Sequence, residues 1–313
     1  MKKIFSFLNE KVKLDIIKYN KNFQKTLSVD IEYYKEISRK YIIYGINGDG
    51  KEYDKYDTLI FEGKYLNGKR NGKGKEFYSN GKIKFEGTYL NGKKWNGKGY
   101  DINNKYTFLI ENGNGKIKEY YPSGKLKYEA YYINGEMNGK IKEYKEDYEY
   151  INCREVEEVF ECELYYLEYE GKCLKGERNG EGKEYHKNGK LKFEGEFLNG
   201  KRNGKGKEYE TYNEFEGEYL DGEKWNGIGK EFYSDRKIKF KGEYLKGKRW
   251  NGIGYNINNN IEYKLVNGEG LVKEYSLFGR LEFEGRYSNG VRNGYGKEYD
   301  FNGKLEFEGE FFN

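Results

Sequence analysis

The sequence predicts an all-β repeat array in which consecutive antiparallel β-hairpins form one elongated twisted sheet, preceded by a short α-helical N-terminal cap. Two observations predict this class. The first is composition: the 313 residues include 43 glycines, 35 tyrosines and 19 phenylalanines but one proline, and only 35% are hydrophobic. Many glycine turns and large rings, with few aliphatic side chains, favour a thin stacked sheet over a thick globular core. The second observation is a repeated segment.

A segment of 23 to 25 residues recurs along the chain, and the copy at residues 59–82 reads LIFEGKYLNGKRNGKGKEFYSNGK. Further copies occupy residues 83–105, 167–190, 191–213, 213–237, 238–260 and 281–304, shortened copies occupy 106–125 and 261–280, and the final LEFEGEFFN is half a copy. A longer period lies over this one, because residues 83–101 return at 238–256, an offset of 155 residues. Such periods predict repeats stacked along one axis.

Each copy is predicted to form one hairpin. In KLKFEGEF the side chains alternate, which places Phe193 and Phe197 on one face and Lys192 and Glu194 on the other. The face with alternating lysine and glutamate is expected to be a solvated exterior with weak cross-strand ion pairs. KGKEYE is then the returning strand, and the chain turns again at NGK, residues 188–190.

Two Asn-Gly pairs follow the first strand of the copy, Asn199-Gly200 and Asn203-Gly204, and both are expected to supply the positive φ angles of a tight hairpin turn. The glycine of the FEG segment needs a separate reason. We expect it to leave room for a neighbouring ring to lie across the strand. It occurs at Gly63, Gly87, Gly171, Gly195, Gly217, Gly242, Gly285 and Gly309.

The FEGEFLNGKRNGKGKEY copies resemble the MORN repeat, whose pattern is a YEGEW-type strand, an NG turn, a GxGxY-type returning strand and a closing turn. YYPSGKLKYEAYYINGEMNGKIKEY resembles the shorter MORN variant of bacterial and protist repeat proteins. The resemblance covers about residues 59–313. Phe or Tyr replaces the tryptophan of the family pattern, and NG replaces its usual HG. The resemblance implies a non-catalytic binding protein, with a historical link to phosphoinositide-associated proteins.

Residues 1–40 have few glycines and carry apolar residues at helical spacing, including Leu8, Val12 and Ile16. They are predicted to form short helices that either cap the first edge of the array or dock a partner, and they faintly resemble the helical start of an F-box adaptor. Residues 41–313 form the array. An acidic insert at about 145–166 interrupts it, and its sequence is compatible with a helix or with extended strands.

Charge is nearly balanced overall, with 58 basic and 53 acidic side chains, but it is unevenly distributed. Residues 60–125 carry 14 basic and six acidic side chains, a net charge of +8, whereas residues 143–170 carry two and 11, a net charge of −9. Three cysteines without CxxC spacing predict reduced thiols and no zinc site. The apolar run of the first residues is too short for a signal peptide, so we expect a soluble, cytoplasmic protein, either free or associated with membrane or cytoskeleton.

The inventory of reactive groups predicts that the chain is not an enzyme and needs no cofactor or metal. His186 is the only histidine, so Ser/His/Asp and Cys/His arrangements have one available base, and that base follows a strand at a turn. No complete GxxxxGK[ST] or GxGxxG occurs. A single-layer sheet also offers few of the pockets in which pKa values are tuned.

Two groups of residues are candidates for interaction with a partner. Trp95, Trp225 and Trp250 each precede Asn-Gly, in segments read as turns one residue longer than the KRNG form and therefore on one sheet edge. They are either aromatic anchors of a partner footprint or staples of their own loops. The second group is basic and consists of Lys69, Arg70, Lys73, Lys93 and Lys94.

The leading functional hypothesis is a scaffold for protein–protein interaction that also self-associates end to end. One alternative is peripheral binding to anionic phospholipid membranes through residues 60–125. Another is a substrate adaptor, if residues 1–40 act as an F-box. Nucleic-acid binding ranks last because the basic residues alternate with acidic ones and form no clean positive patch.

Overall fold

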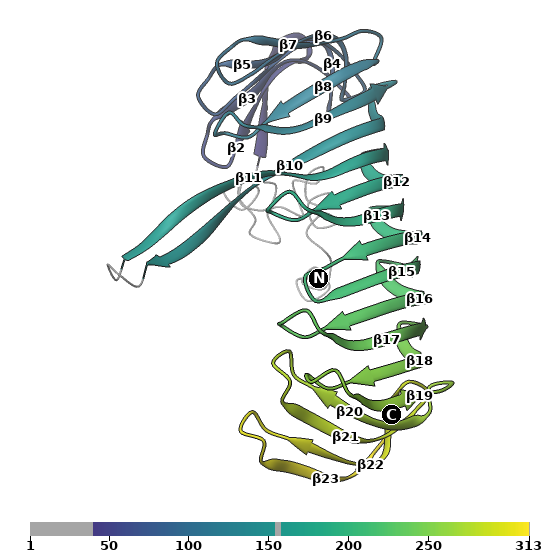
Figure 1. Cartoon of the computed structure of the whole chain (residues 1–313). Coiled ribbons are helices and arrows are strands. Elements are labelled where there is room, and N and C mark those ends of the chain that lie inside the picture. The colour runs from purple at the N-terminus through teal and green to yellow at the C-terminus, as the bar shows by residue number, and fades with distance from the viewer. Residues whose placement is uncertain (1–39, 154–157, 313) are drawn as a thin grey trace, which may run out of the picture. The chain divides into compact units, whose positions relative to one another are not determined.

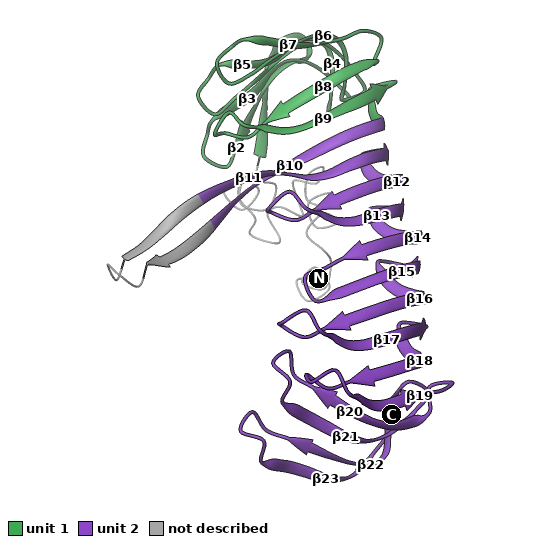
Figure 2. Cartoon of the chain, viewed as in Figure 1, with its two compact units in different colours: residues 1–138 green, residues 139–313 purple. Residues whose placement is uncertain are grey.

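A computed structural model describes residues 40–153 and 158–312, and these residues form 23 β-strands and one 3-10 turn, Ile46–Gly48. Every pairing between named strands is antiparallel, which confirms the all-β class. The predicted helical cap at residues 1–40 lies outside the described residues except for Lys40, which begins the first strand. The array divides into two compact units, residues 1–138 and residues 139–313 (Figure 2).

Unit 1 contains nine strands and the start of a tenth, in chain order (Figure 1). They are β1 (Lys40–Tyr44), β2 (Asp49–Asp54), β3 (Leu59–Leu66), β4 (Lys69–Phe77), β5 (Ile83–Leu90), β6 (Lys93–Tyr100), β7 (Tyr106–Ile110), β8 (Gly115–Tyr120) and β9 (Leu126–Ile133). β1 to β7 form one seven-stranded sheet in which each strand pairs with the next, and β8 pairs with β9.

Unit 2 continues the same arrangement with the remaining strands. They are β10 (Glu136–Cys153), β11 (Glu158–Leu174), β12 (Glu177–Tyr185), β13 (Leu191–Leu198), β14 (Lys201–Tyr209), β15 (Asn213–Leu220), β16 (Glu223–Phe232), β17 (Ile238–Leu245), β18 (Lys248–Tyr255), β19 (Ile261–Leu265), β20 (Gly270–Tyr275), β21 (Leu281–Ser288), β22 (Val291–Tyr299) and β23 (Leu305–Phe311). β10 to β19 are neighbours in one sheet, and β20 to β23 form a separate four-stranded sheet.

The expectation of one continuous sheet is wrong, because the ladder is interrupted inside both units. The interruptions fall between β7 and β8 and between β19 and β20, where only the isolated bridges Glu111–Asn114 and Val266–Glu269 remain. These are the two shortened copies, and they lie 155 residues apart like the blocks that contain them. Their first strands have five residues instead of the usual eight, too few to continue the pairing through the next turn.

The described part of the acidic insert, residues 145–153 and 158–166, is extended rather than helical. It belongs to β10 and β11, which have 18 and 17 residues and form the longest hairpin of the described chain (Figure 1). The open choice between helix and strands is therefore settled in favour of strands.

The hairpin turns have two residues, as the first Asn-Gly pair predicts. Asn199 and Gly200 have φ angles of 50° and 81°, and Leu198 pairs with Lys201 across them. The second pair, Asn203-Gly204, is not a turn. It lies inside β14, where three residues bulge opposite Glu196, and only Gly204 has positive φ, at 85°. The return strand of each repeat therefore begins at Lys201 and its equivalents, four residues earlier than the pattern KGKEY indicates.

The two faces of the sheet differ, and we call the one that carries the phenylalanines the ring face and the opposite one the charged face. On the ring face, edge-to-face rings form a continuous column: Phe193 contacts Phe197 at a centroid distance of 5.3 Å, and Phe197 contacts Tyr169 at 5.2 Å. Phe193 is fully buried, as are Phe61, Phe85, Phe240 and Phe283. A single layer can bury these five rings because a cationic side chain of the next strand covers each of them.

Glycines that face each other on paired strands let the two backbones approach closely beneath the rings. At Gly63, a Cβ would lie 2.5 Å from the Cα of the facing Gly74 and 2.9 Å from Phe61 Cζ. The expected ring is therefore present, and the facing backbone is a second constraint that is just as tight. An added Cβ would meet a facing glycine Cα at 2.5–2.7 Å at Gly63, Gly87, Gly195, Gly217, Gly242 and Gly285.

In seven repeats the ring of the first strand is covered by a cation from the next strand, and glutamates link these cations into chains. Arg202 stacks over Phe193 at 4.2 Å and bonds Glu184 at 2.7 Å and Glu208. Glu184 also accepts from Arg178 at 2.8 Å. In unit 1 a series of ion pairs links Glu52, Arg70, Glu76, Lys94 and Glu119, with N···O distances of 2.6–3.2 Å. A ring, a cation that is arginine or lysine, and a glutamate thus form the core of these repeats.

Acid is expected to destabilise the array through these glutamates. Burial opposes ionisation of Glu76, but Lys94 and Arg70 outweigh it and lower its pKa from 4.5 to about 2. A carboxylate with a depressed folded-state pKa stabilises the fold above its unfolded pKa, and that stability is lost as pH falls through the folded value. We therefore expect urea midpoints to change little from pH 7 to 5 and to fall between pH 4.5 and 2. A midpoint that stays constant down to pH 3 would contradict this.

Candidate interaction groove

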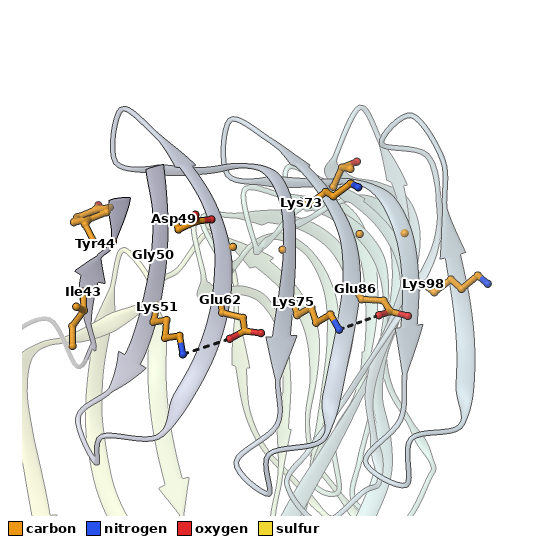
Figure 3. A pocket seen from close by; sticks show the side chains of 16 residues that line it. Ile43, Tyr44, Asp49, Gly50, Lys51, Glu62, Lys73, Lys75, Glu86 and Lys98 are labelled. Atoms are coloured by element: carbon orange, nitrogen blue, oxygen red, sulfur yellow. Dashed lines mark ion pairs between the residues drawn. The ribbon is translucent and has the colours of Figure 1, made fainter. Parts of the chain in front are cut away.

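The charged face of the seven-stranded sheet carries two rows of side chains that run across the strands. Strand registry aligns Lys51, Glu62, Lys75, Glu86 and Lys98 in one row of alternating sign (Figure 3). Within it the closest pairs, Lys51 with Glu62 and Lys75 with Glu86, are loose, at 3.9 and 3.8 Å. Exposed pairs of this kind contribute little to stability, so the row is available for other contacts.

A second row lies two residues along each strand and contains Asp49, Lys73 and Thr88. Between the rows, backbone alone forms the floor, because the intervening residues are the facing glycines. Those floor residues are Gly50, Gly63, Gly74, Gly87 and Gly97. The two rows and this floor enclose an open groove of about 850 Å³, closed at the β1 side by Ile43 and Tyr44.

The groove has a mixed charge, with four lysines and three carboxylates among its lining side chains. Within the described residues Lys73 and Lys98 form no ion pair, so their ammonium groups can donate hydrogen bonds to a carboxylate of a ligand. The alternation of sign disfavours a purely anionic ligand, which would meet Glu62 and Glu86 as well as the lysines. A long ligand with interspersed charges fits this surface better.

The structure separates the predicted basic residues into two groups. Lys73 lines the groove, Lys69 is exposed at the start of β4, and Lys93 is exposed and pairs with Glu136 at 2.7 Å. Arg70 and Lys94 instead lie on the ring face, over Phe61 and Phe85, inside the ionic chain. We therefore assign Arg70 and Lys94 to the core and not to a partner surface. The two-residue turn at Asn67-Gly68 pairs Tyr65 with Arg70. This pairing indicates that Arg70 lies on the same face as Tyr65, the ring face.

The three tryptophans lie inside strands β6, β16 and β18, so their placement in longer turns is corrected. The turns of these hairpins have two residues like the others, and the tryptophans occupy bulges instead. All three are half-buried. The indole of Trp95 packs against the next turn, where a Cβ at Gly113 would lie 2.8 Å from its Cζ3, and Trp250 makes the same contact with Gly268. This packing favours a stapling role, directed at the neighbouring turn.

Unit 2 contains a second hollow, of about 1160 Å³, beside the turns that follow β12, β14 and β16. It includes His186, whose Nε2 lies 2.9 Å from the carbonyl oxygen of Tyr209. Its lysines are mostly engaged internally, Lys145 with Glu168 and Lys192 with Glu210, both at 3.6 Å. The hollow therefore offers fewer free groups than the groove.

Groups that carry chemistry are sparse in the part of the chain that the structure describes. There, no cluster of three or more His, Cys, Asp or Glu side chains could hold a metal ion. Cys173 is buried, and that burial raises the pKa of its thiol, which disfavours the reactive thiolate. The same residues include no helix long and apolar enough to cross a membrane.

Stacked hairpins with facing glycines define the class of the chain as a β-hairpin repeat protein. Residues 70–91, 113–134 and 178–199 match the family model described as the MORN repeat variant, and residues 193–211 and 283–304 match the MORN repeat. The chain therefore carries MORN repeats, as its sequence pattern indicates. The F-box resemblance falls on residues outside the described chain, and neither family match extends to it.

Comparison with individual proteins adds little. A search of curated proteins found no match. Among solved structures, one titled "Crystal Structure of TcdB2-TccC3-TEV" aligns with 82% of this chain at 12% identity and a TM-score of 0.19. This chain spans 14% of the length of that chain. At this TM-score the likeness carries no argument about fold or function.

Proposed function

We propose that this protein is a non-catalytic MORN-repeat scaffold and that the groove of the seven-stranded sheet binds an extended segment of a protein partner. The observation that supports this most directly is the pair of free lysines, Lys73 and Lys98, beside a floor of bare backbone. A glycine floor lets a main chain approach closely, and the two rows of charge select its side chains. Such a partner carries carboxylates that reach these lysines and basic groups that reach Glu62 and Glu86.

The geometry of the rows supports an extended ligand over a compact one. Neighbouring strands are about 4.8 Å apart, so lysines on alternate strands repeat every ~9.6 Å along the row. A polyproline II segment advances about 3.1 Å per residue and returns to the same face every third residue, a repeat of ~9.3 Å. A partner with acidic residues at i, i+3 and i+6 would match Lys51, Lys75 and Lys98 in turn.

Anionic membrane is the weaker candidate, for a reason specific to the basic stretch at residues 60–125. Arg70, Lys84 and Lys94 are engaged with Glu76 or Glu119 on the ring face and cannot face a lipid surface. Lys64 already pairs with Asp49 on the charged face, at 2.9 Å. The net charge of +8 in the sequence therefore overstates the charge presented to a membrane.

The double substitution Lys73→Glu/Lys98→Glu is expected to weaken partner binding about tenfold or more, because it replaces two attractive contacts with two repulsive ones. Proteins captured from cell extract by the immobilised chain would be identified, and their affinity would be measured by calorimetry. Lys241→Glu/Lys264→Glu is the matched control, since it makes the same charge change on exposed strand lysines of unit 2.

A captured protein whose affinity is unchanged by the groove substitutions would contradict the groove as the binding surface. Sedimentation with anionic phospholipid vesicles over a salt series tests the membrane alternative. Strong salt-sensitive vesicle binding, with no protein captured, would overturn the scaffold proposal in favour of a peripheral membrane protein.

A further inference from the structure

The charged face of unit 2 departs from alternating charge at β16 to β19, the strands that precede the break in its ladder (Figure 1). From β11 to β15, acidic and basic residues alternate in register across the strands. They are Glu170, Lys183, Glu194, Lys207 and Glu216. From β16 to β19, the adjacent row aligns Lys230, Lys241, Ile253 and Lys264, which we call the lysine row. The lysine row contains three cations and no carboxylate.

The block of unit 1 that lies 155 residues earlier has a different row at the same positions. Lys75, Glu86, Lys98 and Leu109 are in register there. Glu86 lies between two lysines and lowers the net charge of that row, whereas its counterpart in unit 2 is Lys241. The two blocks therefore repeat the same strand pairings but present different charges on the same face.

Folding does not account for the lysines of the lysine row. Lys230 and Lys241 are directly opposite each other in register, and like charges in that position are destabilising. Lys230 has a carboxylate partner, Glu214 at 3.5 Å. Lys241 and Lys264 are exposed, and neither forms an ion pair with a residue that the structure describes. A glutamate in place of Lys241, as in unit 1, would remove the repulsion, so this lysine indicates a role other than stability.

Two isoleucines accompany the lysines on the charged face. Ile253 is half-buried within the lysine row, and Ile228 lies in the row beside it and is 60% exposed. Their counterparts in unit 1 are Lys98 and Lys73, the lysines of the groove that form no ion pair. Apolar contacts thus replace two cations of the groove, and the lysine row supplies cations at other positions. Unit 2 therefore does not repeat the ligand preference of the groove.

We propose that the lysine row and Ile228 bind an extended segment of a protein partner in which acidic and apolar side chains alternate. An extended strand presents alternate side chains to one face and rises about 3.3 Å per residue, so residues i, i+2 and i+4 span ~13 Å. The four strands of the lysine row span ~14 Å. An acidic, an apolar and a second acidic side chain therefore reach Lys230, Ile253 and Lys264 in turn. This surface is distinct from the groove, and the proposal does not depend on the groove.

The row beside the lysine row favours such a narrow ligand over an anionic membrane or a nucleic acid. Glu216 and Glu243 are exposed there, on the two sides of Ile228. A flat polyanionic surface would meet both carboxylates together with the lysines, and repulsion would offset the attraction. A single segment that lies along the lysine row avoids them. Its apolar side chains also make contacts with the isoleucines that phosphate groups cannot make.

The test is the affinity of the full chain for the labelled peptide SESISESISES, measured by fluorescence anisotropy. Saturable binding that weakens with added salt is expected, because attraction between exposed charges is screened. The peptide SQSISQSISQS lacks the carboxylates and should bind about tenfold more weakly, and SESSSESSSES lacks the apolar side chains and should bind about threefold more weakly. No saturable binding of the parent peptide, or equal binding of all three, would overturn the proposal.

Substitutions in the chain locate the site. Lys241→Glu introduces the residue that unit 1 has at this position, so the urea midpoint should be at least that of the unaltered chain, while the peptide binds about tenfold more weakly. Lys241→Glu/Lys264→Glu, which does not alter the groove, should weaken binding further, and Ile228→Ser should weaken it about threefold. Lys201→Glu is the matched control, because Lys201 is exposed and has no ion pair among the described residues. Equal losses from Lys241→Glu and Lys201→Glu would refute the assignment.

Other occupants of the lysine row would give different results, and each of these would overturn the proposal. A loss of peptide affinity in Lys73→Glu/Lys98→Glu but not in Lys241→Glu would place the peptide in the groove. A salt-sensitive dimer of the chain alone that Lys241→Glu abolishes would assign the row to a second copy, whose acidic residues concentrate at 143–170. Sedimentation with anionic phospholipid vesicles that requires Lys241, without peptide binding, would assign the row to a membrane surface.

Discussion

Replacing Arg202 with methionine is expected to lower the free energy of unfolding by about 3 kcal/mol, because two buried carboxylates each lose one of their two cationic partners. Arg202 bonds both Glu184 and Glu208, which are largely shielded from solvent, and it covers Phe193. Methionine keeps much of the volume and the contact with the ring, so the loss reports the ionic contacts. Urea unfolding followed by circular dichroism measures it.

Arg202→Lys is the matched control and should cost about 1 kcal/mol, the value of one lost hydrogen bond. Lysine already occupies the same position in two repeats, where Lys94 and Lys224 cover Phe85 and Phe215. It retains the charge but gives up the bidentate geometry of the guanidinium. If methionine and lysine cost the same, the ionic chain does not hold the repeats together.

Gly87→Ala is expected to destabilise unit 1 by about 3 kcal/mol through overpacking. A Cβ at Gly87 would collide with the carbonyl oxygen of Asn96 and would lie 2.7 Å from Gly97 Cα. Both atoms belong to the backbone of the paired strand, which can move away only by breaking the ladder. Thermal unfolding should show a lower midpoint for unit 1.

Gly45→Ala is the control, because its nearest neighbours would be 3.7 Å from the new Cβ and its φ of −94° suits any residue. It should change stability by less than about 0.5 kcal/mol. Equal effects at the two positions would mean that Gly87 matters through chain flexibility alone and not through the close approach of the strands.

Local signals in the sequence were sufficient for the hairpins. Alternation in KFEGEF places Phe193 and Phe197 together, and the first Asn-Gly pair sets a two-residue turn. Both signals act within a few residues, where backbone sterics decide the outcome. The recurrence of the segment then predicts that the hairpins stack, because each hairpin must pair with the next to bury its rings.

The sequence does not predict that Arg70 and Lys94 lie in the core, and the reason is the same one that misplaces the tryptophans in turns. Bulges in the return strands, as at Asn203-Gly204, use the same residue types as turns, so the KRNG and WNG segments predict turns although they form bulges. With that reading Arg70 lies at the sheet edge, whereas the structure places it over Phe61. The turn at Asn67-Gly68 pairs Tyr65 with Arg70, and this pairing distinguishes a position over Phe61 from a position at the sheet edge.

The groove could not be predicted, although its residues could be aligned. It depends on the registers of several strand pairs, which bring side chains and glycines from β2 to β6 together, and no single segment of the sequence contains that information. The shortened copies were visible in the sequence, but their effect was not. Five-residue strands such as β7 and β19 end a sheet, an effect that no local pattern indicates.

The glutamates shared between neighbouring repeats bear on how such a protein lengthens. Four repeats, at residues 59–82, 167–190, 191–213 and 213–237, each contribute a ring, a cation and an acid that pairs with the cation of the following repeat. The copies at 83–105 and 238–260 have a glycine, Gly99 or Gly254, at the position of the acid. An in-frame tandem duplication of one of the four repeats therefore joins like surfaces and leaves no charge stranded at the seam. The two blocks 155 residues apart are what such growth produces, and whole-repeat insertions should be tolerated where single substitutions in the same strands are not.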